Sequence, residues 1–300
     1  MPRARPGPPR RATGRRRDAA PSEGAPVSRL AFSPARVGAM VARYSYLLRG
    51  SWPRLLDLMY WPTVQLVTWG FIQRFVGGAA AAGGPQGKLA VGAGTLIGAV
   101  MLWDVLFRGQ LGFSLSFLEE MHSRNVGNLF MSPLRPLEFV ASLMVMSLVR
   151  LALGVVPVTG LAVLFFGFNL WGLGLALGFF FANLLLTSWS VGLVVSGFLL
   201  RHGLGAEELA WSFMFLLLPL CCVYYPVAVL PGWLQPVSWA LPPTYVFEGL
   251  RAVLNDGVVR TDLMVEALAI NACLFAAATL AFLWFLRASR AAGTLLQMGE

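Results

Sequence analysis

The chain has 300 residues, of which 57% are hydrophobic and 12% are charged, and its formal net charge is +9. Soluble domains carry roughly 25% charged residues. A soluble fold of this length could not bury so much apolar surface, so lipid must surround most of the chain. The composition therefore excludes a soluble globular domain.

The first 32 residues are basic and rich in Pro, Gly and Arg, with few residues that could form a core. We expect residues 1–32 to be a disordered tail. An arm that binds nucleic acid is an alternative. The neighbouring membrane domain favours a tail held near anionic lipid on the cytoplasmic side. We therefore expect membrane lipid, and no nucleic acid, among the partners.

The next segment, residues 33–54, begins with Ser-Pro, which is a good helix start. Apolar residues recur there at helical spacing, while Arg36, Arg43 and Arg49 lie off that stripe. The stripe consists of Val37, Met40, Val41, Tyr44, Leu47 and Leu48. This pattern predicts an amphipathic helix that lies in the cytoplasmic interface of the membrane.

The pattern predicts a transmembrane domain over residues 33–290, followed by a short C-terminal tail at 291–300. A helix needs about 20 mostly apolar residues to cross a bilayer. Six segments meet this requirement, at about 55–75, 89–116, 137–168, 170–200, 209–226 and 264–287. The predicted fold class is an all-α polytopic membrane protein with six transmembrane helices, preceded by the interface helix.

Residues 209–247 carry no charge and are long enough for two crossings, but they contain six prolines. Proline removes a backbone donor and blocks the preceding helical turn. Five of the six prolines lie from Pro226 onward. We therefore expect one crossing and then a re-entrant segment, 227–247, between spans five and six. Such broken backbone at membrane depth has to be covered by protein or line a water-filled cavity.

The distribution of Lys and Arg favours six spans with both termini cytoplasmic, in a plasma (inner) membrane. On that topology 17 basic residues lie on the cytoplasmic side and 4 on the other, with Arg108 and Arg150 inside the membrane. A seventh span would place Arg287 and Arg290 outside, against the positive-inside rule.

One compact polar stretch, residues 117–140, interrupts the apolar chain between the second and third spans. Glu119 and Glu120 end one helix, residues 121–131 can form a short helix, and two X-Pro pairs then redirect the chain. The short helix mixes polar His122, Arg124, Asn125 and Asn128 with apolar Val126, Leu129 and Phe130. That mixture favours docking onto another protein, and the alternative is an ordinary solvated loop.

Two stretches carry a resemblance to a known family. The first is "LWDVLFRGQLGFSLSFLEEMHSRNVGNLFMSPLRPLEFVAS", which includes a Pro-Leu-x-Pro-x-Glu turn at 133–138, and the second is "YYPVAVLPGWLQPVSWALPPTYVFEGLRAVL" at 224–254. Their order and spacing resemble the ABC-2 type permease family, over roughly residues 33–290. The Arg-rich start of the chain lies outside the resemblance.

The resemblance implies the permease half of an ATP-driven exporter, in which two permease subunits pair with two cytoplasmic ATPase subunits. A homodimer of this chain is expected. In that family a cytoplasmic coupling helix transmits the movement of the ATPase, and the substrates are amphiphiles such as drugs, lipids and lipid-linked glycans. The residues implied for that helix are Glu119, Glu120, Met121, His122, Arg124, Asn125, Asn128, Leu129 and Phe130.

The chain itself shows no site for ATP. Its one lysine, Lys88, follows "AAGGPQG", where Ala82 replaces the first glycine of a phosphate-binding loop and Leu89 replaces its final Ser or Thr. We therefore expect no cofactor on this chain, with ATP and Mg on the partner subunit, and no catalytic residue. Cys221, Cys222 and Cys273 lie in apolar runs without paired spacing, so we expect neither disulfides nor a metal site.

Of the ionisable residues in the predicted spans, Asp104, Arg108 and Arg150 are the candidates for charges at membrane depth, whereas Asp57 lies nearer an interface and needs no special role. Asp104 and Arg108 are four residues apart on one helix face and can pair. Arg150 is the best candidate for a charge that faces the bundle or a water path. The alternative for Arg150 is a structural bond to Asp104 or Glu138. The substrate-binding residues are not predicted.

Two other functions stay open on the sequence. An ion-coupled secondary transporter that works without an ATPase would need acidic residues at mid-span and an internal repeat, and Asp104 alone gives weak support. A membrane enzyme that acts on lipid would need a polar catalytic cluster at an interface.

Overall fold

Every regular element of residues 32–81 and 94–292, the part described by the computed structural model, is a helix. The long helices are α2 (Trp52–Ala81), α3 (Thr95–His122), α5 (Pro136–Phe166), α6 (Leu175–His202) and α10 (Thr261–Ala291). The shorter ones are α1 (Pro34–Arg49), α4 (Val126–Met131), α7 (Leu209–Leu220), α8 (Gln235–Trp239) and α9 (Pro242–Asp256), with 3-10 turns η2 (Leu170–Leu173), η3 (Leu204–Ala206) and η4 (Val227–Val229). The two expected tails lie almost wholly outside the described residues, as does Lys88.

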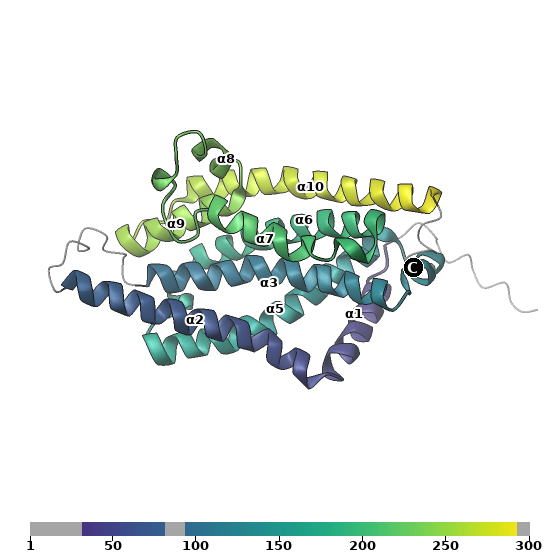
Figure 1. The fold of residues 1–300 in the computed structure, drawn as a ribbon, viewed down its shortest axis with the longest axis horizontal. Helices are drawn as coiled ribbons and strands as arrows, with labels where there is room; N and C mark the ends of the chain where they lie inside the picture. The colour runs from purple at the N-terminus through teal and green to yellow at the C-terminus, as the bar shows by residue number, and fades with distance from the viewer. Residues whose placement is uncertain (1–31, 82–93, 293–300) are drawn as a thin grey trace, which may run out of the picture. The chain divides into compact units, whose positions relative to one another are not determined.

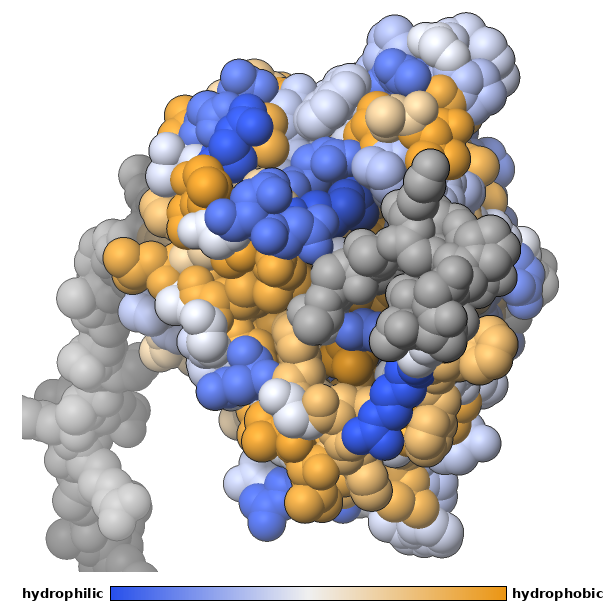
Figure 2. All heavy atoms as spheres, turned by 90° about the vertical axis from the view of Figure 1, so that its left-hand side faces the viewer, coloured by the Kyte–Doolittle hydropathy of each residue, from blue (hydrophilic) through white to orange (hydrophobic). Residues whose placement is uncertain are grey.

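The long helices run side by side, and α1 lies at the opposite end from α8 and α9 (Figure 1). We call these the α1 end and the α9 end. Figure 2 looks onto the α9 end, where hydrophilic and hydrophobic side chains are mixed on the surface. Polar and charged side chains are thus part of the surface at the α9 end, among apolar ones.

Helix α3 forms the centre of the bundle and is buried along its apolar stretch. It packs between α5 and α6, and small residues let these neighbours approach. A Cβ added at Gly109 would lie 2.5 Å from Ser188 Oγ of α6, and one at Gly112 would lie 3.0 Å from Ser147 Cα of α5. These contacts fix α3 as the core against which the other helices are ordered.

Helices α6 and α10 are joined by a buried polar cluster. Thr187 Oγ1 donates to Asn271 Oδ1 at 2.7 Å, and Asn271 Nδ2 donates to both Asn183 O and Asn183 Oδ1 at 3.0 Å. All three side chains are buried. In an apolar medium such groups need partners, so the cluster fixes how the two helices pair.

Within the described residues, α3, α5, α6 and α10 are long and apolar enough to cross a membrane. This confirms an all-α polytopic membrane protein. Helix α2 has 30 residues, which is also sufficient length. The fifth expected span, 209–226, is helical only in its first part, because α7 has 12 residues and ends at Leu220.

Helix α7 ends early because the backbone turns at Cys222, whose φ is +53°. The α9 side chains hold the chain that follows. Arg251 donates to Cys222 O at 3.0 Å, and Glu248 Oε1 accepts from Val227 N at 2.7 Å. Thr244 Oγ1 donates to Ser238 O at 2.7 Å. Protein groups thus satisfy part of the irregular backbone, as a segment at membrane depth would need.

Candidate functional site

Helix α1 is fastened to the bundle by two arginines. Arg36 pairs with Glu138 of α5 at 3.0 Å, and Arg43 donates to both oxygens of Glu120 of α3, at 2.7 and 3.1 Å. The predicted helix and its apolar stripe are present, with Met40, Tyr44 and Leu48 buried. The expectation that α1 simply lies in the interface is incomplete, because it packs on α5 and α2. Its carboxylate partners lie too far along the chain for helical spacing to reveal them.

Glu138 joins three parts of the chain at the α1 end. It is fully buried. Its Oε1 accepts from Ser33 N at 2.8 Å, and its Oε2 accepts from Arg135 N at 3.0 Å and from Arg36 at 3.0 Å. The glutamate of the Pro-Leu-x-Pro-x-Glu turn therefore caps α5 and holds the start of α1 to it.

Glu120 has a matching position at the end of α3. It is buried and accepts from Arg43 and, at 2.8 Å, from Asn125 Nδ2 in the turn before α4. Burial, together with the nearby Glu120 carboxylate, raises the pKa of Tyr44 far above its ordinary value, so this hydroxyl stays neutral. Glu120 thus connects α1, α3 and the turn that leads into α4.

Glu119 completes the set of acids, and it is the bonding partner of Arg150, for which the structural alternative had named other acids. Arg150 bonds to neither Asp104 nor Glu138. It donates to both oxygens of Glu119 at 3.0 Å, and Arg54 of α2 reaches the same carboxylate at 3.0 Å. Sequence spacing could not show this pair, because the α3–α5 packing brings the two residues together.

The short helix is smaller than expected. Residues 121 and 122 belong to α3, and α4 covers only Val126–Met131. The α3 end has the hydrogen bonds of a Schellman motif, Asn125 N to Glu120 O and Arg124 N to Met121 O, both 2.9 Å. Arg124 takes the left-handed position, φ +54°, where glycine is usual. Glu119 and Glu120 therefore lie at the C-terminal end of α3 and cannot begin the coupling helix.

The residues expected to contact a partner differ in exposure. His122, Arg124 and Asn128 are exposed, and Asn125 is half-buried. Glu119, Glu120 and Met121 face inward, and Val126 is buried. Leu129 and Phe130 are half-buried against the core, and Phe130 lies edge-on to Phe139 with Arg290 over its ring at 5.0 Å.

The apolar side chain that protrudes from α4 is Met131, which is 73% exposed and absent from the sequence-based set. Its place just before the Ser-Pro turn was the available signal. His122 also lies 3.6 Å from Glu207, in the connection between α6 and α7. At the α1 end, α4 and its flanking turns therefore place polar side chains and one apolar side chain together on the exposed surface.

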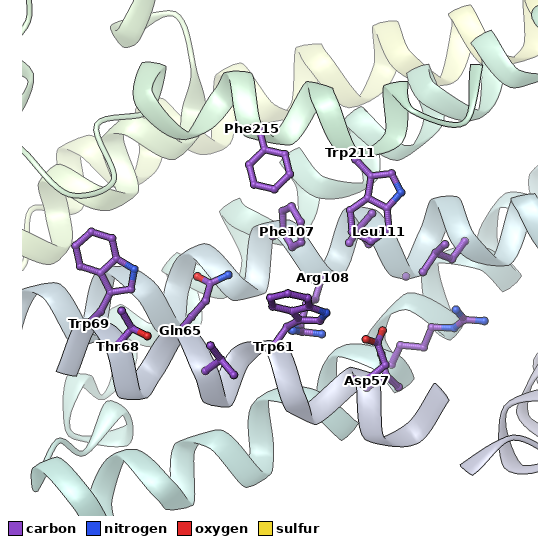
Figure 3. A pocket seen from close by; sticks show the side chains of 15 residues that line it. Asp57, Trp61, Gln65, Thr68, Trp69, Phe107, Arg108, Leu111, Trp211 and Phe215 are labelled. Carbon is purple, nitrogen blue, oxygen red and sulfur yellow. The ribbon is translucent and has the colours of Figure 1, made fainter. Parts of the chain in front are cut away.

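A cavity of about 470 Å³ opens between α2, α3, α5 and α7. Figure 3 shows side chains of α2, α3 and α7 that line it. Aromatic groups dominate its wall: Trp61 and Trp69 from α2, Phe107 from α3, and Trp211 and Phe215 from α7. This volume is within the range of sites for drug-sized ligands.

The charged residues predicted inside the spans are brought together near this cavity. Asp104, Arg108 and Arg150 are 2%, 8% and 5% exposed, so all three face protein. Arg108 and Arg150 line the cavity, and so does Asp57, which sequence reasoning left without a role. The expected Asp104–Arg108 pair is present as a charge contact, 3.7 Å from Oδ1 to Nε, which is longer than a hydrogen bond.

A family model for ABC-2 type transporters matches residues 47–255. The chain belongs to the ABC-2 type transporter family. The match includes α2 to α7, the Pro-Leu-x-Pro-x-Glu turn and nearly all of α9. It leaves out α10 and most of α1, so it is narrower than the resemblance over 33–290. No curated protein matched the chain in a further search.

Members of the ABC-2 type family are the membrane components of ABC transporters, so this chain is an ABC permease subunit and a multi-pass membrane protein. In the described part of this permease no cluster of His, Cys, Asp and Glu could hold a metal ion. Cys221 and Cys222 are buried and Cys273 is exposed, all as free thiols.

Proposed function

We propose that this permease moves an amphiphilic substrate outward across the membrane, driven by ATP that is hydrolysed on a separate subunit. The observation that carries the proposal is the family match over α2–α9. The aromatic cavity supports an amphiphile, such as a drug, a lipid or a lipid-linked glycan. The wall offers apolar surface for its body and buried charge for a polar group.

Two cytoplasmic ABC ATPase subunits, which carry ATP and Mg, would dock at the α1 end, one on each permease copy. The surface offered there combines Arg124 and Asn128 with Met131. A push on α4 would pass through Asn125 to Glu120, and from Glu120 to both α1 and α3. The path is short and made of direct polar contacts, which suits transmission of movement between packed helices.

The proposed topology has six spans, with α2 first, α7 and the segment that follows it as the fifth, and both termini cytoplasmic in the inner membrane. Support comes from the arginines that gather at the α1 end, such as Arg36, Arg43 and Arg54, together with the family match. On this topology residues 227–247 re-enter from the outside; Glu248 accepts from Val227 N at the start of this segment, and Arg251 donates to Cys222 O just before it. A second copy of the chain would complete the permease.

Co-expression with the ABC ATPase encoded nearest to this gene tests the proposal. Tagged permease should retain that ATPase through gel filtration, and the complex in lipid discs should hydrolyse Mg-ATP faster than the ATPase alone. The control is the same ATPase with an unrelated membrane protein. Transport in vesicles that depends on an ion gradient and continues without ATP would instead establish the ion-coupled alternative.

A further inference from the structure

We propose that the cavity between α2, α3, α5 and α7 binds an amphiphile with an acidic head group, and that Arg108 receives this head. The inference rests on the proposed function, because export of the bound amphiphile depends on it, and it names the substrate class of the cavity. Arginines and carboxylates are both present near the cavity, so the hydrogen bonds of Arg108, and not the net charge of the wall, distinguish the ligand.

Arg108 is more than nine-tenths buried and lines the cavity (Figure 3). In the part of the chain that the structure describes, its Nε has no hydrogen-bond partner, and its nearest carboxylate, Asp104, stays at 3.7 Å. A guanidinium presents donors in a planar fork that fits a carboxylate or a phosphate. The buried Nε–H of Arg108 therefore lacks an acceptor that an acidic head would supply.

Arg150 adds a second buried guanidinium to the same wall. Two of its contacts hold Glu119, and its Nε is also without a hydrogen-bond partner among the described residues. Two acids interact electrostatically with Arg108. Asp57 of α2 lines the cavity but is exposed, whereas Asp104 is buried and is not part of the lining. The buried charges that face the cavity itself are thus positive.

The rest of the wall fits the body of the same ligand. Trp61, Phe107, Trp211 and Phe215 offer apolar faces, and Gln65 and Thr68 add two small polar groups. An amphiphilic acid would leave its tail on the aromatic rings and place its head at the two arginines. The head of a cationic amphiphile would instead be repelled by two buried arginines. The carboxylate that lines the cavity and could pair with it, Asp57, is exposed.

Photo-crosslinking on the permease alone tests this assignment without any ATPase. The permease would be placed in discs of phosphatidylcholine and labelled with dodecyl phosphate that carries a diazirine on its tail. We expect crosslinks to α2 and α7 around Trp61 and Trp211, competed by dodecyl phosphate and dodecanoate and not by dodecyltrimethylammonium. Equal competition by the cation would overturn the proposal, even for a permease that couples normally to its ATPase.

Variants locate the head group. Arg108→Gln should reduce crosslinking at least tenfold, Arg108→Lys should reduce it less, and Arg260→Gln, which changes an exposed arginine paired with Asp262, should leave it unchanged. Undiminished labelling of Arg108→Gln would also overturn the assignment. If that variant does not fold, the competition series on the unaltered protein decides alone.

A further experiment distinguishes two sources of the acidic head group, an acidic lipid of the membrane and a single-chain amphiphile. Adding phosphatidylglycerol to the discs should abolish crosslinking if a resident acidic lipid fills the cavity, and should leave it if the site admits single-chain amphiphiles only. Both results support an acidic head group.

Discussion

At the scale of single residues, three glutamates organise the α1 end. Glu119 accepts hydrogen bonds from arginines of α2 and α5, and Glu120 accepts from an arginine of α1 and an asparagine of the turn before α4. Glu138 accepts from backbone N–H groups just before α1 and just before α5. Buried carboxylates are tolerable only with such partners. Each glutamate is therefore a junction whose loss affects more than one helix.

Replacement of Glu138 by Gln should reduce the free energy of unfolding of the purified permease by roughly 2 kcal/mol, and should therefore lower its thermal midpoint. The new amide would lose the ion pair with Arg36 and cannot accept from all three donors. The control is Asp262→Asn, whose partner Arg260 is exposed, and it should leave the midpoint unchanged. Equal shifts for both variants would contradict the role given to Glu138.

The backbone conformation of Arg124 leads to a second prediction, about the stability of the turn between α3 and α4. Because its φ is +54°, Arg124→Gly should be tolerated or stabilise the turn, whereas Arg124→Val should destabilise it by about 1 kcal/mol or more. Thermal midpoints measured in one detergent compare the two. If Val is tolerated as well as Gly, the turn between α3 and α4 is not under this conformational constraint.

At the scale of elements, one side of α4 packs against the bundle, and its C-terminal end is exposed. Phe130 is part of the bundle through Phe139 and Arg290, whereas Met131 projects away from it. A substitution at Phe130 would therefore disturb the fold and any interface together. Met131 is the better probe of the proposed ATPase contact.

Met131→Ser should leave the thermal midpoint nearly unchanged and weaken retention of the ATPase, with loss of the stimulated ATP hydrolysis. Phe130→Ala should lower the midpoint in the absence of any partner, because it removes an aromatic contact from the core. Gel filtration and an ATP hydrolysis assay on the co-expressed complex make the comparison. Normal retention of the ATPase by Met131→Ser would place the interface elsewhere.

The long helices were predictable because a bilayer requires long apolar runs, and α3, α5, α6 and α10 follow those runs closely. Helix α1 was predictable from its stripe, but its docking was not. The short α7 was missed because contacts from α9 decide where it ends.

Some residues of the candidate site could be named from the sequence, but the cavity and most of the contacts could not. The polar stretch led to α4 and to the acids beside it, and the charged residues of the spans led to Arg108 and Arg150. The partner of Arg150 and the aromatic wall were not accessible, because four helices that are distant in sequence combine to form them.

At the scale of the whole molecule, the α1 end collects ion pairs and basic residues, and the α9 end collects irregular backbone. Reporter fusions at Asp256 and Glu300 should therefore report opposite sides of the membrane. The same side for both would contradict the six-span topology.

Cysteine labelling can test the proposed re-entrant segment in a background without the native cysteines. Gly232 and Trp233 are exposed and suit this purpose, whereas Ser238 is buried and hydrogen-bonded to Thr244. Cysteines at Gly232 and Trp233 should react with an impermeant reagent from the exterior only. Reaction from the cytoplasmic side would show that the segment crosses the membrane.

The ion pairs of α1 impose an order on biosynthesis. Arg43 leaves the ribosome 77 residues before Glu120, and Arg36 leaves it 102 residues before Glu138. At a synthesis rate of about 5–20 residues per second, the newborn helix waits roughly 4–20 seconds for its carboxylates. Anionic lipid can hold its arginines and its apolar stripe during that interval. Helix α1 therefore reaches its final place only after α3 has been made and α5 has begun to insert.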